Sequence, residues 1–102
     1  MGISIEVRTR NYEDDAIHVK KSVVNLASLC GEPLGYNIGE PTSKFGWTFY
    51  TIHFDENLFS KINTKFDDMI QKSRGKDDKF ITFMTRYFDA RGAKVNLKLL
   101  TN

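Results

Sequence analysis

The chain has 102 residues, of which 40% are hydrophobic and 13% aromatic. This length and composition support one domain, residues 1–102, with its own core, and exclude an intrinsically disordered protein. The formal net charge is +2, and the single cysteine, Cys30, excludes an internal disulfide framework.

The first ten residues, MGISIEVRTR, predict a half-buried strand. Apolar residues at positions 3, 5 and 7 alternate with polar residues at positions 4, 6 and 8, the period of a strand with one wet face. Charges follow too soon for a signal peptide or a membrane span. We therefore expect a soluble, cytoplasmic protein that does not contact a membrane.

The stretch NYEDDAIHVKKSVVNLASLCG predicts an amphipathic helix. Asn11 is placed to cap its start, and three acidic residues follow in the first turn, where the helix dipole favours them. One apolar stripe consists of Tyr12, Ala16, Val19, Val23, Leu26 and Cys30. Gly31 is a suitable end for this helix.

Residues 31–46, GEPLGYNIGEPTSKFG, predict a long loop because they hold four glycines and both prolines. Loops of this length in compact domains are often functional. Four apolar residues indicate that the loop packs against the body of the domain: Leu34, Tyr36, Ile38 and Phe45.

GWTFYTIHF, residues 46–54, predicts a strand that is aromatic on both faces. A helix then begins at Asp55 and ends at residues 73–75, with one apolar stripe. The members of that stripe are Leu58, Phe59, Ile62, Phe66, Met69 and Ile70.

Residues 79–88 fit two assignments. Their β-branched and aromatic residues suit a strand, but their apolar period favours a helix capped by Asp77 or Asp78 and ended by Gly92. Residues 94–99 alternate again and predict a last strand. The result is a small α+β domain of order β-α-loop-β-α-α-β, with a three-stranded sheet packed against two or three helices. With residues 79–88 as a strand, the order becomes β-α-β-α-β-β.

The aromatic strand raises the question of what lies over its second face, which carries Trp47, Phe49 and His53. If helices cover one face of the sheet only, these side chains share the other face with Arg8, Lys94 and Lys98. One interpretation is structural: the third helix or the long loop covers the rings. A second is an interface with another protein or a second copy of the chain. A third is single-stranded nucleic acid stacked on the rings.

Basic residues gather in the last third of the chain, where residues 71–102 hold eight basic and three acidic side chains, against seven and ten in residues 1–70. A basic end favours an anionic ligand such as nucleic acid, whereas the structural alternative is a solvated surface. Besides Lys94 and Lys98, the candidate contacts to an anionic ligand are Lys72, Arg74, Lys76, Lys79, Arg86 and Arg91.

No motif names a reaction. His18 and His53 are the only histidines, and Cys30 falls on the core stripe of its helix, where cysteine is usually inert. Ligand spacing for a metal is lacking, and no cofactor is indicated. If the protein were an enzyme, His53 would be the most plausible base.

We therefore expect a non-enzymatic protein that binds another protein. The small size and the Lys-, Asn-, Asp- and Phe-rich composition are in the style of inhibitor, immunity and phage or plasmid accessory proteins. The alternative is a small nucleic-acid-binding protein that uses the basic last third and the aromatic strand.

Overall fold

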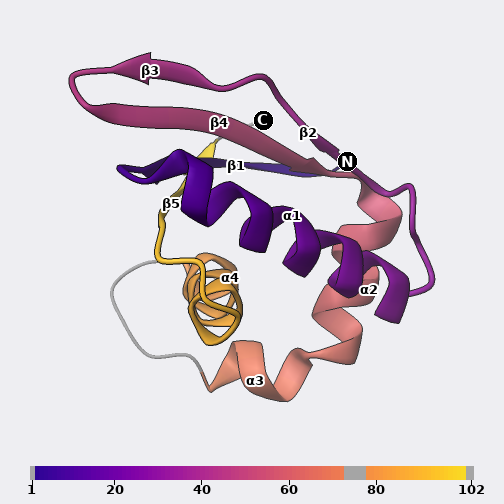
Figure 1. Ribbon diagram of the computed structural model, residues 1–102. Coiled ribbons are helices and arrows are strands. Elements are labelled where there is room, and N and C mark those ends of the chain that lie inside the picture. Colours follow the sequence, from indigo (N-terminus) through magenta and orange to yellow (C-terminus); the bar gives the residue numbers. More distant parts are fainter. Residues whose placement is uncertain (1, 73–77, 101–102) are drawn as a thin grey trace.

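An antiparallel sheet with a layer of helices on one of its faces makes up the computed structural model, which describes residues 2–72 and 78–100 (Figure 1). The strands are β1 (Ile3–Thr9), β2 (Tyr36–Ile38), β3 (Thr42–Lys44), β4 (Trp47–Phe54) and β5 (Asn96–Leu100). The helices are α1 (Tyr12–Leu29), α2 (Glu56–Lys65), α3 (Asp67–Gln71) and α4 (Lys79–Ala90).

The sheet has the order β2-β4-β1-β5, and β3 pairs with the half of β4 that β2 leaves free. All of these pairs are antiparallel. In the centre, Ile5 lies between Ile52 of β4 and Leu99 of β5. Since directly opposed residues in a sheet point to the same face, this register separates the two faces of all five strands.

The core lies between the sheet and the helices. Its fully buried side chains come from both layers: Ile5, Val7, Ile52 and Phe54 from the sheet, and Val19, Val23, Leu26, Leu58, Ile62, Met84 and Phe88 from the helices. Phe80 makes edge-to-face contacts with Phe54 and Phe59 at ring-centroid distances of 6.0 and 5.0 Å. Burying each such side chain contributes about 1.5–3 kcal/mol, so this layer of apolar residues holds the helices against one face.

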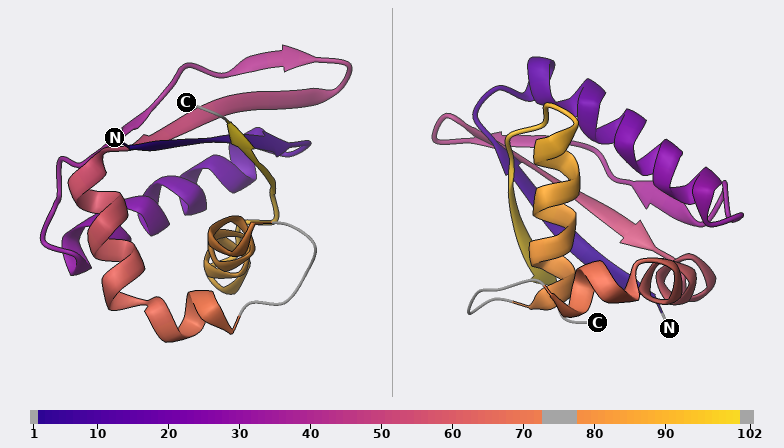
Figure 2. Two further views of the ribbon diagram at one scale, coloured as in Figure 1. Left: turned by 180° about the vertical axis from the view of Figure 1, so that it is seen from behind. Right: turned by 90° about the horizontal axis from the view of Figure 1, so that it is seen from below.

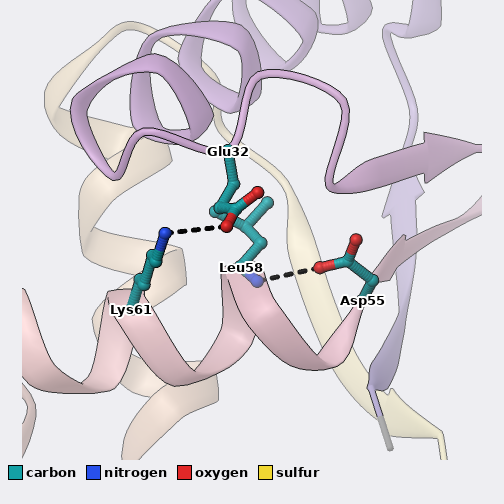
Figure 3. A network of polar contacts seen from close by, with 4 residues as sticks. All are labelled: Glu32, Asp55, Leu58 and Lys61. Atoms are coloured by element: carbon teal, nitrogen blue, oxygen red, sulfur yellow. Dashed lines mark hydrogen bonds and ion pairs between the residues drawn. The ribbon is translucent and has the colours of Figure 1, made fainter.

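Aspartate side chains cap the N-termini of two helices, α2 and α4. Asp55 accepts a hydrogen bond of 2.8 Å from the backbone N–H of Leu58, and Lys61 of the same helix pairs with Glu32 at 2.7 Å (Figure 3). Asp78 accepts from the N–H groups of Phe80 and Ile81 at 2.8 and 3.3 Å. These contacts satisfy donors that the first turn of a helix leaves free.

The expected three-stranded sheet is wrong, because the predicted loop at residues 31–46 contains β2 and β3. Each strand has only three residues and is flanked by glycine or proline, so its composition resembles that of a loop. The backbone of β4 provides the pairing that makes them strands.

The helical assignment of residues 79–88 is confirmed, and the strand alternative is wrong. The helix predicted from Asp55 is interrupted at Phe66, which separates α2 from α3, and its predicted end at residues 73–75 lies outside the described residues. Asp78 caps α4, whereas Asp77 also lies outside them. The last strand begins at Asn96, two residues later than predicted.

Candidate interaction surface

One face of the sheet carries none of the described helices (Figures 1 and 2). We call this surface the open face. The strand register places on it Ser4, Glu6 and Arg8 of β1, Asn37 of β2, Thr42 and Lys44 of β3, Trp47, Phe49, Thr51 and His53 of β4, and Asn96, Lys98 and Leu100 of β5. The alternate residues of β4 from Tyr50 to Phe54 are buried under the helices. The predicted division of β4 into two faces is therefore confirmed.

Trp47 and Phe49 are half-buried, and neither belongs to the hydrophobic core. Phe49 lies between Arg8 of β1 and Thr42 of β3 in the sheet. The guanidinium of Arg10 lies over the ring of Trp47, 4.4 Å from its centroid. In the segment that was predicted as a loop, β3 pairs with β4 beside these rings. The helices lie on the opposite face of the sheet (Figure 2). A helix therefore does not cover them.

The turn between β3 and β4 displays a third ring. Lys44 pairs with Trp47, so Phe45 and Gly46 form a two-residue loop, with φ angles of 54° and 80°. Positive φ at both positions is the signature of a type I′ turn, which prefers Asn-Gly or Asp-Gly. Phenylalanine in this conformation costs about 1–2 kcal/mol, yet its side chain is 89% exposed and recovers little by burial.

The sequence predicted a packed position for Phe45 and Leu34, and both predictions are wrong, since Leu34 is 93% exposed. The sequence analysis did not predict the turn between β3 and β4, although the sequence contains a signal for it. Gly46 stands between a short polar run and an alternating aromatic run, which is a pattern of hairpins. We call residues 44–46 the hairpin tip.

Positive charge dominates the open face near the hairpin tip. Arg8, Arg10 and Lys44 are exposed, and none of them pairs with a carboxylate of the described residues. Further along the sheet, Lys98 lies directly opposite Glu6, which offsets part of its charge. The half of the open face near the hairpin tip is therefore suited to meet negative charge.

His53 is exposed on the open face, and its Nδ1 lies 2.8 Å from the hydroxyl oxygen of Ser4. A hydroxyl beside an imidazole can be a nucleophile with its base, but that chemistry also needs a third group to orient the ring. No described residue forms a hydrogen bond with the other ring nitrogen.

The basic residues of the last third of the chain do not form one surface with the aromatic strand. Of those described, Lys98 alone lies on the open face. Lys94 lies outside β5 and pairs with Asp89 of α4 at 3.4 Å. Four others belong to the helical layer: Lys72 at the end of α3, and Lys79, Arg86 and Arg91 on or beside α4. Arg74 and Lys76 lie outside the described residues.

A small apolar hollow of about 270 Å³ lies between α3 and α4, with Arg86 and Arg91 among its lining residues. The guanidinium of Arg91 stacks on the ring of Tyr87 at 3.7 Å from the centroid. This contact occupies one face of the ring, so Arg91 is engaged by a residue of α4, the helix that it follows.

Cys30 is buried in the core, as its place on the helical stripe predicted. Burial raises the pKa of its thiol above the ordinary value, and the nearby ammonium groups of Lys65 and Lys61 oppose only part of this rise. His18 is exposed on α1, a helix that lies on the other side of the sheet from the open face (Figure 1). In residues 2–72 and 78–100, no three His, Cys, Asp or Glu side chains gather as metal ligands.

The described helices are all too short or too polar to cross a membrane. A comparison with protein-family models gave no match, and comparisons with curated proteins and with solved structures gave no significant match.

Proposed function

We propose that this protein binds another protein through its open face, without catalysing a reaction. The observation that carries the proposal is the pair of rings, Trp47 and Phe49, left half-exposed on a sheet face without described helices, beside Arg8 and Arg10, which form no ion pair with a described carboxylate. Aromatic and arginine side chains are the residues that most often dominate the binding energy of protein interfaces.

The small size and composition support a cytoplasmic inhibitor, immunity protein or phage or plasmid accessory protein within this class. Such proteins act by occupying a surface of their target, which requires a rigid face and no catalytic group. The sheet supplies rigidity, because β4 is hydrogen-bonded along both of its edges. A preorganised face loses little conformational entropy on binding.

The test is affinity capture from a lysate of the source cells with the tagged protein and with Trp47→Ala/Phe49→Ala. We expect the wild-type protein to retain a defined partner that the double variant loses. Leu34→Ala is the matched control, since it removes an exposed apolar side chain distant from these rings and should retain the partner. Equal retention by all three proteins would contradict the proposal.

Nucleic acid is the second candidate, favoured by three cations around Phe49 and Trp47 that form no ion pair with a described residue. Bases would stack on Phe49, and on Trp47 once Arg10 leaves its ring, while Arg8, Arg10 and Lys44 contact phosphates. Trp47 is the only tryptophan, so its fluorescence reports directly on this surface. Quenching by a single-stranded oligonucleotide, with affinity that falls steeply as salt rises, would support this candidate.

Nuclease treatment of the lysate separates the two candidates. A partner bound directly to the open face stays on the column after treatment, whereas proteins bridged by nucleic acid are released. Light scattering on the purified protein tests the remaining partner, a second copy of the chain.

A further inference from the structure

We infer that Phe45 is an anchor: the hairpin tip inserts this ring into an apolar pocket of the partner protein, and carboxylates at the rim of that pocket meet the cations around the tip. This inference rests on the proposed function, because it names the chemistry of the partner surface. It also adds a residue that the open face alone does not contain.

The first step is the conflict between Phe45 and its own turn. The backbone at this position is left-handed, which asparagine, aspartate and glycine tolerate and bulky residues rarely adopt. Its ring is 89% exposed and lies outside the core, so the fold gains little from it. A strained position that the fold does not need points to a role in binding.

The second step is that the turn is held in place before binding. Ser43 and Thr48 bring their hydroxyl oxygens within 3.3 Å of each other across the hairpin. Lys44 and Trp47 pair at the last rung, where Arg10 lies over the tryptophan ring. A ring presented from a fixed hairpin loses little freedom on insertion, which is the condition for a strong anchor.

The third step is charge. Lys44 places its ammonium 5.4 Å from the Phe45 ring centroid, and Arg10 and Arg8 follow along the open face. Carboxylates lie on the other side of the hairpin, where Glu13 and Asp14 of α1 line a hollow of about 400 Å³ that Arg10 also borders, so Lys44 and Arg8 are the cations that lie apart from these acids. A partner is therefore oriented with its acidic rim toward the open face and away from α1.

The inference is tested with Phe45→Asn, a variant whose turn suits asparagine and which should fold at least as well as the wild type. We expect it to bind the captured partner about tenfold or more weakly, as for a central aromatic anchor. Leu34→Asn makes the same chemical change at an exposed site beside β2 and should bind as the wild type does. Unchanged binding by Phe45→Asn, with binding lost in Trp47→Ala/Phe49→Ala, would overturn the anchor while leaving the proposed function intact.

Charge is tested by Lys44→Glu, with Lys21→Glu on the exposed side of α1 as the matched control. Weaker binding by the first variant alone supports an acidic rim, and equal effects overturn it. A photo-crosslinking phenylalanine analogue at position 45 should attach to a partner segment with apolar residues flanked by Asp or Glu. Attachment to a basic or wholly polar segment would contradict the inference.

Anionic lipid is the competing target for an exposed ring beside cations. Vesicles of phosphatidylcholine with 30% phosphatidylserine provide the probe, with Phe45→Asn as comparison. We expect no co-sedimentation of either protein. Co-sedimentation of the wild type that the variant loses would overturn a protein pocket as the target. If the wild type captures no protein at all, the proposed function itself fails.

Discussion

Thr9 donates a hydrogen bond of 2.6 Å from its hydroxyl to the Asp15 carboxylate, and both side chains are buried. The same hydroxyl accepts the backbone N–H of Asn11 at 3.1 Å. One side chain at the end of β1 thereby connects the strand to the first turn of α1. Asn11 occupies the cap position of α1 but forms no side-chain capping bond, so Thr9 and Asp15 take its place in fixing the turn.

Thr9→Val keeps the shape of this side chain and removes its hydroxyl. The Asp15 carboxylate then stays buried without its donor, which costs roughly 1–3 kcal/mol of unfolding free energy. Urea denaturation followed by circular dichroism measures this loss. Thr64→Val, at an exposed position of α2, is the control and should change stability by no more than about 0.5 kcal/mol. Similar effects at both positions would argue against a specific role for the buried bond.

Tyr50 presents the opposite situation, since its buried hydroxyl has no hydrogen-bond partner among the described residues. Tyr50→Phe removes an unsatisfied group without leaving a cavity. We therefore expect the variant to be as stable as the wild type at neutral pH, or more stable by up to about 1 kcal/mol. Thermal unfolding at pH 7 checks this, and a clear loss of stability would mean that the hydroxyl has a partner in solution.

Tyr50 should also make the stability of the protein depend on pH. Burial, with smaller contributions from Tyr12 and Asp15, raises the pKa of Tyr50 well above its ordinary value of 10. Above about pH 10 the unfolded chain ionises this tyrosine while the folded protein keeps it neutral, so stability falls as pH rises. The urea midpoint of Tyr50→Phe should fall less between pH 9 and pH 11 than that of the wild type.

Periodicity in the sequence was sufficient to predict the elements that bury a continuous apolar stripe. The alternation in β1 and the helical spacing in α1 and α4 each identify the face that enters the core, whereas β4 is aromatic on both faces and its alternation left that choice open. The period also resolved residues 79–88 correctly, against a local composition that suits a strand. Such patterns agree with the structure because burial of the whole apolar stripe stabilises the element that carries it.

The remaining features of the fold and of the candidate surface depend on contacts between distant segments, which the spacing of residues in the sequence does not reveal. β2 and β3 have three residues each and exist because β4 pairs with them. Phe45 was expected to be packed because it is aromatic, but the turn geometry directs it into solvent. The separation of Lys72, Lys79, Arg86 and Arg91 from the open face follows from the position of α3 and α4 on the other side of the sheet (Figure 2).

Cys30 should react slowly with a disulfide reagent in the folded protein. Burial restricts access, and its raised pKa lowers the thiolate fraction at pH 8. We expect a large increase in the rate of labelling when urea unfolds the chain. Cys30→Ser that stays folded should bind the partner normally, and a loss of binding in that folded variant would assign the thiol a functional role.

Trp47→Ala/Phe49→Ala should remain folded, because both rings lie outside the core. Removing half-buried aromatic side chains should cost less than the roughly 3–5 kcal/mol typical of a buried one. Phe54→Ala, on the buried face of the same strand, supplies that comparison and should be the more destabilised variant. Circular dichroism and urea denaturation measure both. An unfolded double variant would show that the rings support the fold, and the open face would lose its role.

Phe45→Asn should separate stability from binding. Asparagine tolerates the left-handed backbone that Phe45 adopts at 54°, so the strain of about 1–2 kcal/mol should be relieved in part. The variant should therefore unfold at a higher temperature and bind its partner more weakly. Differential scanning calorimetry and the capture assay measure the two effects on the same preparations. Leu34→Asn changes a similarly exposed side chain in a separate turn, closed by the Gly35 N–H and the Glu32 carbonyl, and the capture assay should not change in it. A Phe45→Asn variant that is less stable than the wild type would show that the exposed ring supports the hairpin, and the strain at this position would then need no explanation in binding.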